Sequence, residues 1–167
     1  MKKTLILGIG NEILTDDGIG PKLVNELQKK GFPGNIHFQN AFVGGLEILE
    51  IIGGYQNVVF IDAIITEKGK PGTVYHFTPD DFKETLHLSN LHDTNFLTAL
   101  ELGRKMNMPL PSEIHIIAVE IIEDHIFSNQ FSPEIDSKYS LILNTVKNLI
   151  DNLINIKTKT VQKVKSD

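Results

Sequence analysis

The chain has 167 residues, the size of one domain, and its formal net charge is −5. This charge argues against a nucleic acid or an anionic membrane as partner, and the absence of cysteine excludes disulfides, thiolate metal sites and cysteine nucleophiles. No apolar run has the length and flanks of a signal peptide or a membrane span, so we expect a soluble, cytoplasmic protein.

The first half of the chain alternates between strand and helix patterns. Thr4–Ile9 is a short apolar run that predicts a buried strand. Residues 18–30 carry apolar side chains at helical spacing and predict an amphipathic helix. We expect a second strand over residues 35–43 and a short helix over residues 46–52. Residues 57–64 are apolar almost throughout, which is typical of a parallel strand buried on both faces.

The second half continues the alternation after a polar loop. Residues 73–77 predict a short strand at the sheet edge, antiparallel because the loop before it is too brief for a parallel crossover. Residues 80–89 predict an irregular connection with a helical turn. We expect a helix over residues 92–106 and a strong strand over residues 113–122. The Ser132-Pro133 pair is typical of an N-cap followed by proline at the first position of a helix.

This order of elements predicts an α/β fold in three layers. The expected fold has a twisted, mostly parallel five-stranded sheet with one antiparallel edge strand and helices on both faces. The apolar pattern ends near residue 154, so we expect residues 1–154 to form a single domain. Residues 155–167 are rich in lysine and should form a basic, solvated tail without regular structure.

The loop from Gly8 to Gly20 organises the rest of the chain. It contains four glycines, which permit sharp turns and close approach of other groups, and the adjacent acids Asp16 and Asp17. Either acid could bind a cation or could cap the following helix. Asp62 ends the third strand, and an acid in so apolar a strand needs a partner.

Asp17, Asp62 and His92 form a candidate metal site. Ligands of such folds bind beyond the carboxyl ends of the strands, and all three residues are expected at that edge. Two carboxylates and one imidazole suit zinc, nickel, iron or manganese with open positions. A lone histidine is more often a surface or capping residue, so a metal site here requires the three polar groups to lie within roughly 3–5 Å of one another.

Other chemistries fit the sequence poorly. Gly8 and Gly10 begin a dinucleotide-binding fingerprint, but the third glycine position is Ile13 and no acid ends the second strand. The chain has no Gly-x-Ser-x-Gly elbow and no His-Glu-x-x-His helix. A serine hydrolase and a common zinc peptidase are therefore disfavoured.

Short motifs spread over residues 4–150 resemble those of the hydrogenase maturation endopeptidases, which trim the C-terminus of nickel–iron hydrogenase large subunits. In chain order they are Gly8-x-Gly10-Asn11, Asp16-Asp17-Gly18-x-Gly20, Gly45-Leu46-Glu47, Ile61-Asp62-Ala63, Pro71-Gly72-Thr73 and Leu91-His92. The resemblance implies a compact α/β domain and an endopeptidase that removes the C-terminal extension of a large-subunit precursor after nickel insertion.

The resemblance also implies roles for individual residues. Asp17, Asp62 and His92 correspond to the family's catalytic, metal-binding residues, which grip nickel carried by the precursor; cadmium or zinc could occupy the site in vitro. The nickel could activate the attacking water, or it could serve only to allow the precursor to bind. We expect a monomer whose partner is the C-terminal region of the precursor.

One loop departs from the family's pattern. Many members have Asp-Gly-Gly-Thr where this chain has Asn40-Ala41-Phe42-Val43, so a carboxylate is lost. This difference favours the alternative function, a non-catalytic, metal-dependent checkpoint or chaperone that binds the same precursor.

Overall fold

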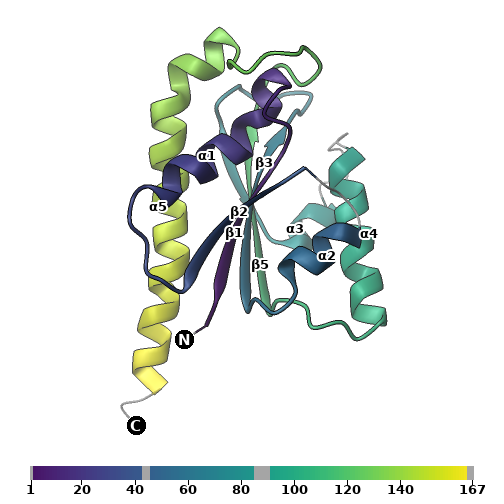
Figure 1. Ribbon diagram of the computed structural model, residues 1–167, viewed down its shortest axis with the longest axis vertical. Helices are drawn as coiled ribbons and strands as arrows, with labels where there is room; N and C mark the ends of the chain where they lie inside the picture. Colours follow the sequence, from purple (N-terminus) through teal and green to yellow (C-terminus); the bar gives the residue numbers. More distant parts are fainter. Residues whose placement is uncertain (1, 43–45, 85–90, 165–167) are drawn as a thin grey trace.

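The computed structural model describes residues 2–42, 46–84 and 91–164; within these ranges the side chains of residues 46, 82–84, 91–95 and 155–164 are not described. The fold has one five-stranded sheet with the strand order β2-β1-β3-β5-β4 (Figure 1). The strands are β1 (Thr4–Ile9), β2 (Ile36–Ala41), β3 (Asn57–Ile64), β4 (Val74–Phe77) and β5 (Glu113–Glu120).

The sheet has the predicted mixed topology. β1 pairs in parallel with β2 and β3, and β3 pairs in parallel with β5. β4 pairs antiparallel with β5 and lies at the edge, which confirms the prediction for residues 73–77. The carboxyl ends of β1, β2, β3 and β5 consequently lie at one end of the sheet, which we call the carboxyl edge.

Helices cover both faces of the sheet, as Figure 1 shows. α1 (Ile19–Gln28) and α5 (Pro133–Val164) lie on one face. α2 (Leu46–Ile52), α3 (Pro79–Glu84) and α4 (Leu91–Lys105) lie on the other. A short 3-10 helix, η1 (Thr15–Gly18), precedes α1. None of the described helices is long and apolar enough to cross a membrane.

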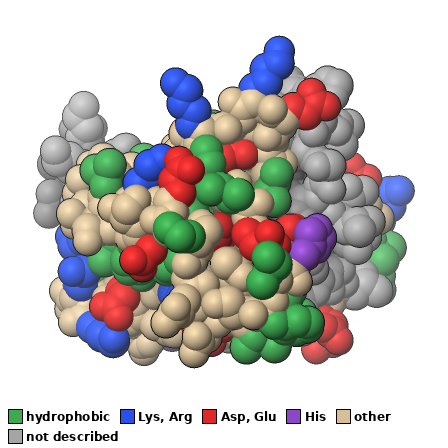
Figure 2. Space-filling view, turned by 90° about the horizontal axis from the view of Figure 1, so that it is seen from above, with side chains coloured by type: hydrophobic (Ala, Val, Ile, Leu, Met, Phe, Trp, Pro, Cys, Tyr) green, Lys and Arg blue, Asp and Glu red, His purple; other side chains and the backbone are tan. Residues whose placement is uncertain are grey.

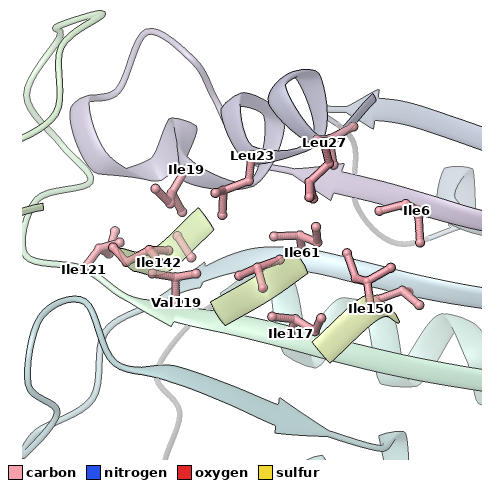
Figure 3. Close-up of a cluster of buried hydrophobic side chains, with 14 of the residues drawn as sticks. Ile6, Ile19, Leu23, Leu27, Ile61, Ile117, Val119, Ile121, Ile142 and Ile150 are labelled. Carbon is pink, nitrogen blue, oxygen red and sulfur yellow. The ribbon is translucent and has the colours of Figure 1, made fainter. Parts of the chain in front are cut away.

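Two apolar clusters fill the space between the sheet and the helices. In β1, Ile6 packs in the cluster under α1 and α5, whereas Leu5 and Leu7 pack in the cluster under α2 and α4. Figure 3 shows the first cluster, in which Leu23 of α1 and Ile150 of α5 lie over the strands. Because every residue of β1 is buried, its sequence is a continuous apolar run rather than an alternating pattern.

The last helix corrects one expectation. α5 continues to Val164, so the prediction of an irregular backbone after residue 154 is wrong. The apolar periodicity stops there, but residues 155–164 contain no glycine or proline that would end a helix. The division into a domain of residues 1–154 and a tail stays a prediction.

Other boundaries shift by a few residues. β5 ends at Glu120 instead of residue 122, because the N–H groups of Ile122 and Glu123 turn toward the side chain of Asp16. The helical turn expected within residues 80–89 is α3, and residues 85–90 lie outside the described part of the chain.

Candidate active site

The glycines of the loop between β1 and α1 allow backbone to pack directly on backbone. A Cβ at Gly20 would overlap the carbonyl oxygens of Ile9 and Ile61, and one at Gly10 would overlap the carbonyl oxygen of Asp17. Gly10 also has a φ of 138°, which side-chain-bearing residues rarely adopt. The start of α1 therefore lies against the ends of β1 and β3, which brings η1 to the carboxyl edge.

Asp16 is a buried structural carboxylate. Its Oδ1 accepts a hydrogen bond from the N–H of Ser132 at 2.7 Å. Its Oδ2 accepts hydrogen bonds from the N–H groups of Glu123 at 3.2 Å and Ile122 at 3.4 Å. The side chain is fully buried, so the acid faces inward and clamps the loop that joins β5 to α5. From the sequence, Asp16 could bind a cation or cap the following helix; among the described residues neither η1 nor α1 has a side-chain cap, and the carboxylate instead accepts N–H groups from the distant loop.

Thr15 fastens the same loop from its other side. Its N–H donates to the carbonyl oxygen of Ser128 at 2.9 Å, and its hydroxyl donates to that of Ile126 at 2.6 Å. Thr15 has a φ of 46°, a strained conformation for a β-branched residue. The two hydrogen bonds hold this conformation, which sets the direction of the two acids that follow.

Asp17 and Asp62 are both half-buried at the carboxyl edge. Oδ2 of Asp17 accepts a hydrogen bond from the N–H of Asn11 at 2.7 Å, and Oδ1 of Asp62 accepts one from the N–H of Ala63 at 2.7 Å. η1 lies against β3, so the two acids come from adjacent elements. Figure 2 views the molecule from this end and shows acidic side chains gathered there.

The third predicted ligand is only partly placed. His92 is the second residue of α4, and α4 begins at the same end of the sheet (Figure 1), but its side chain lies outside the described residues. Among the side chains that are described, no group of three or more His, Asp or Glu could hold a metal ion. The convergence of Asp17, Asp62 and His92 thus stays a prediction.

A second buried acid, Glu120, was missed by the sequence reasoning. Its Oε1 accepts hydrogen bonds from the N–H of Thr66 at 2.6 Å and from the Thr66 hydroxyl at 3.2 Å. Burial raises the pKa of Tyr75, and the neighbouring Glu120 raises it further. Gly69 leaves room for the Glu120 carboxylate, which holds the loop after β3. The sequence prediction extended this strand to residue 122 and so placed Glu120 inside it. The usable signal was that an acid within an apolar run needs a partner.

A groove of about 800 Å³ lies beside α1, α5 and residues 129–133, and neither Asp17 nor Asp62 lines it. Here the ammonium of Lys22 donates to the carbonyl oxygen of Asn129 at 2.7 Å and lies 4.1 Å from the ring centroid of Phe131. Burial lowers the pKa of Lys22. These contacts are a further anchor for the loop between β5 and α5.

The fold and these acids define a single-sheet α/β protein that presents carboxylate oxygens at the carboxyl edge. The chain matches the family model described as HycI, hydrogenase maturation protease, over residues 21–149. This range includes Asp62 and His92 and begins after Asp17.

Individual relatives agree with the family match. The chain is 26% identical over 131 residues to the hydrogenase 2 maturation protease of Escherichia coli strain K12, covering 74% of this chain and 77% of that protein. It superposes on the hydrogenase maturating endopeptidase HybD of E. coli with a TM-score of 0.72 and 22% identity, covering 90% of this chain and 93% of that one. The [NiFe] hydrogenase maturation protease HybD of Thermococcus kodakarensis gives a TM-score of 0.64 and 26% identity, covering 88% and 98%. The chain belongs to the hydrogenase maturation protease family.

Proposed function

We propose that this chain is the endopeptidase that removes the C-terminal extension of a nickel–iron hydrogenase large-subunit precursor after nickel insertion. The observation that carries the proposal is the placement of Asp17 and Asp62 on adjacent elements at the carboxyl edge of a hydrogenase maturation protease. Carboxylate oxygens at an open edge are suited to a cation that arrives in another protein.

Asp17 and Asp62 would meet the precursor's nickel with carboxylates that are already oriented. A backbone N–H donates to one oxygen of each, from Asn11 and from Ala63. These hydrogen bonds fix the direction of the side chains before the partner arrives, which lowers the entropy lost on binding. His92, at the start of α4, would add an imidazole nitrogen, a ligand that nickel accepts.

The direct test is the mass of the large subunit. Nickel-loaded precursor incubated with the protein should lose a short C-terminal peptide, seen as a single mass decrease, whereas nickel-free precursor should keep its mass. A precursor that is unchanged in both reactions contradicts the proposal. Processing of both forms at the same rate contradicts its nickel dependence alone.

The second candidate, a non-catalytic checkpoint that binds the same precursor, is favoured by one observation. The end of β2 carries the amide Asn40 where the motif given by the resemblance has an acid, and the Asn40 side chain donates to Oδ1 of Asn25 at 2.8 Å. Asn25 in turn donates to Glu12 at 3.3 Å, so Asn40 belongs to a structural network. Formation of a complex with nickel-loaded precursor without a mass change would establish this candidate over the endopeptidase.

A further inference from the structure

Several large apolar side chains are exposed on the loops at the carboxyl edge. The exposed fractions are 55% for Ile13, 46% for Ile122, 61% for Ile126 and 78% for Phe127. We call these four residues the apolar rim. Exposed apolar side chains that gather in one region, unlike scattered ones, are typical of interaction sites.

The rim residues lie on two loops that hydrogen bonds join. The N–H of Ser128 donates to the carbonyl oxygen of Ile13 at 3.0 Å, which places the tip of the first loop beside the loop after β5. Oε1 of Glu123 accepts the N–H groups of His125 at 2.6 Å and Ile126 at 2.9 Å. Together with the clamps from Asp16 and Thr15, these bonds fix the backbone that carries the rim. The structure thus displays these side chains on an ordered support, which reduces the entropy that a partner must remove on binding.

The rim is continuous with the candidate site. Ile13 lies four residues before Asp17 on the same loop, and Ile122 follows β5, the strand that pairs with β3 next to Asp62. Figure 2 shows hydrophobic and acidic side chains interspersed over this end of the molecule. Because this surface combines apolar and acidic side chains, it fits a partner that has an apolar patch bordered by positively charged groups.

We propose that the apolar rim is the docking surface for the hydrogenase large-subunit precursor, which it holds so that the precursor's metal site faces Asp17 and Asp62. This inference rests on the proposed function. An enzyme that cuts one bond of one protein needs binding energy from contacts remote from that bond, and a few polar residues cannot supply it. A second copy of this chain fits the rim less well, because a symmetric contact would bring the acidic groups of both copies together.

The test compares two double variants of the full chain. Ile126→Ser/Phe127→Ser removes apolar surface from the rim. Met106→Ser/Leu141→Ser removes apolar surface elsewhere, from side chains that are 63% and 69% exposed, and is the matched control. All four side chains are exposed, so both variants should keep the wild-type thermal transition.

The readouts are the dissociation constant for nickel-loaded precursor, measured by surface plasmon resonance, and the KM and kcat of its processing. We expect the rim variant to raise both Kd and KM by tenfold or more, with kcat changed less than twofold. The control should stay within twofold of the wild type in all three. Ile126→Leu/Phe127→Leu should restore most of the affinity, because it restores apolar area.

The outcomes separate this inference from the proposed function. Equal Kd values for the rim variant and the control overturn the docking surface, whether or not the precursor is processed. If the wild type binds the precursor without processing it, and the rim variant no longer binds, the docking surface is supported and the endopeptidase proposal is contradicted. A wild-type protein that does not bind the precursor contradicts both. A wild-type dimer that the rim variant dissociates shows that a second copy occupies the rim, and it also overturns the docking proposal.

Discussion

Asp16→Asn tests the clamp that holds the carboxyl edge together. The carboxylate accepts N–H groups with both oxygens, at 2.7 Å from Ser132 and at 3.2 and 3.4 Å from Glu123 and Ile122. An amide has one oxygen, so it can keep the shorter bond from Ser132 while its NH2 group then faces the other two N–H donors. Asn at this position therefore loses two acceptor contacts and leaves the partly buried N–H groups of Ile122 and Glu123 without this acceptor.

The expected cost follows from these distances. Hydrogen bonds to a charged group contribute about 1.5–3 kcal/mol each, and the two lost bonds are longer than the usual charge-assisted distance of about 2.7–2.9 Å. Because both bonds are long, counting each at or somewhat below the lower limit gives a loss of about 2–3 kcal/mol in the free energy of unfolding. For a chain of this size, that loss lowers the melting temperature by about 4–12 °C.

Urea denaturation is the appropriate assay, because a loss of stability lowers the midpoint while leaving the slope m unchanged. Asp17→Asn is the matched control: this half-buried side chain can keep its hydrogen bond from Asn11 with the amide oxygen, so we expect a change below about 1 kcal/mol. If Asp16→Asn changes the free energy of unfolding by less than about 0.5 kcal/mol, the range of an ordinary surface substitution, the inward carboxylate is not a clamp.

Three further predictions concern the site, the loop and the titration of one tyrosine. Asp62→Asn and His92→Ala should fold normally by circular dichroism yet process the precursor far more slowly than the wild type. If both variants shift the mass of the precursor at the wild-type rate, the proposed metal site is wrong. Gly20→Ala should lower the free energy of unfolding by more than about 2 kcal/mol, because the added Cβ overlaps two carbonyl oxygens. Gly34→Ala has open space around the added Cβ and should change that free energy by less than about 1 kcal/mol. Equal effects of the two variants in a melting experiment would show that backbone packing at Gly20 does not limit the residue there. Burial, and secondarily Glu26, raises the pKa of Tyr139 from 10.0 to about 12. Between pH 10 and pH 12 the folded state therefore keeps a proton that the unfolded state loses, and the free energy of unfolding should fall as the pH rises. Tyr139→Phe should make this fall shallower in denaturant titrations, and an equally steep fall in the variant would contradict the role of Tyr139.

Much of the fold could be predicted because the central strands β1 and β3 are buried on both faces and are therefore nearly continuous apolar runs. Asn57–Ile64 agrees residue by residue with β3, and the short loop before residues 73–77 was enough to predict the antiparallel edge strand. The end of α5 was missed because loss of apolar periodicity marks exposure, which is a different property from helix termination.

The candidate site was predicted less completely, because much of it depends on contacts distant in sequence. The positive φ of Thr15 requires the carbonyl oxygens of Ile126 and Ser128, more than a hundred residues away. Nothing near Asp16 in the sequence indicates that Ser132 will donate to it. Asp62 could be found from its own strand alone, since an acid that ends an apolar run needs a local explanation.

The two adjacent acids show how one motif serves two purposes. In a 3-10 helix with three residues per turn, consecutive side chains point about 120° apart, so Asp16 and Asp17 of η1 cannot both face the same ligand. Asp16 points into the protein and fastens the loop that carries the apolar rim, while Asp17 stays half-buried at the carboxyl edge. The inward acid therefore couples two parts of the proposed interface: loosening its hydrogen bonds should disturb both the direction of Asp17 and the support of Ile126 and Phe127. For this reason Asp16→Asn should raise the KM for the precursor as well as lower stability, whereas Asp62→Asn should act on processing alone.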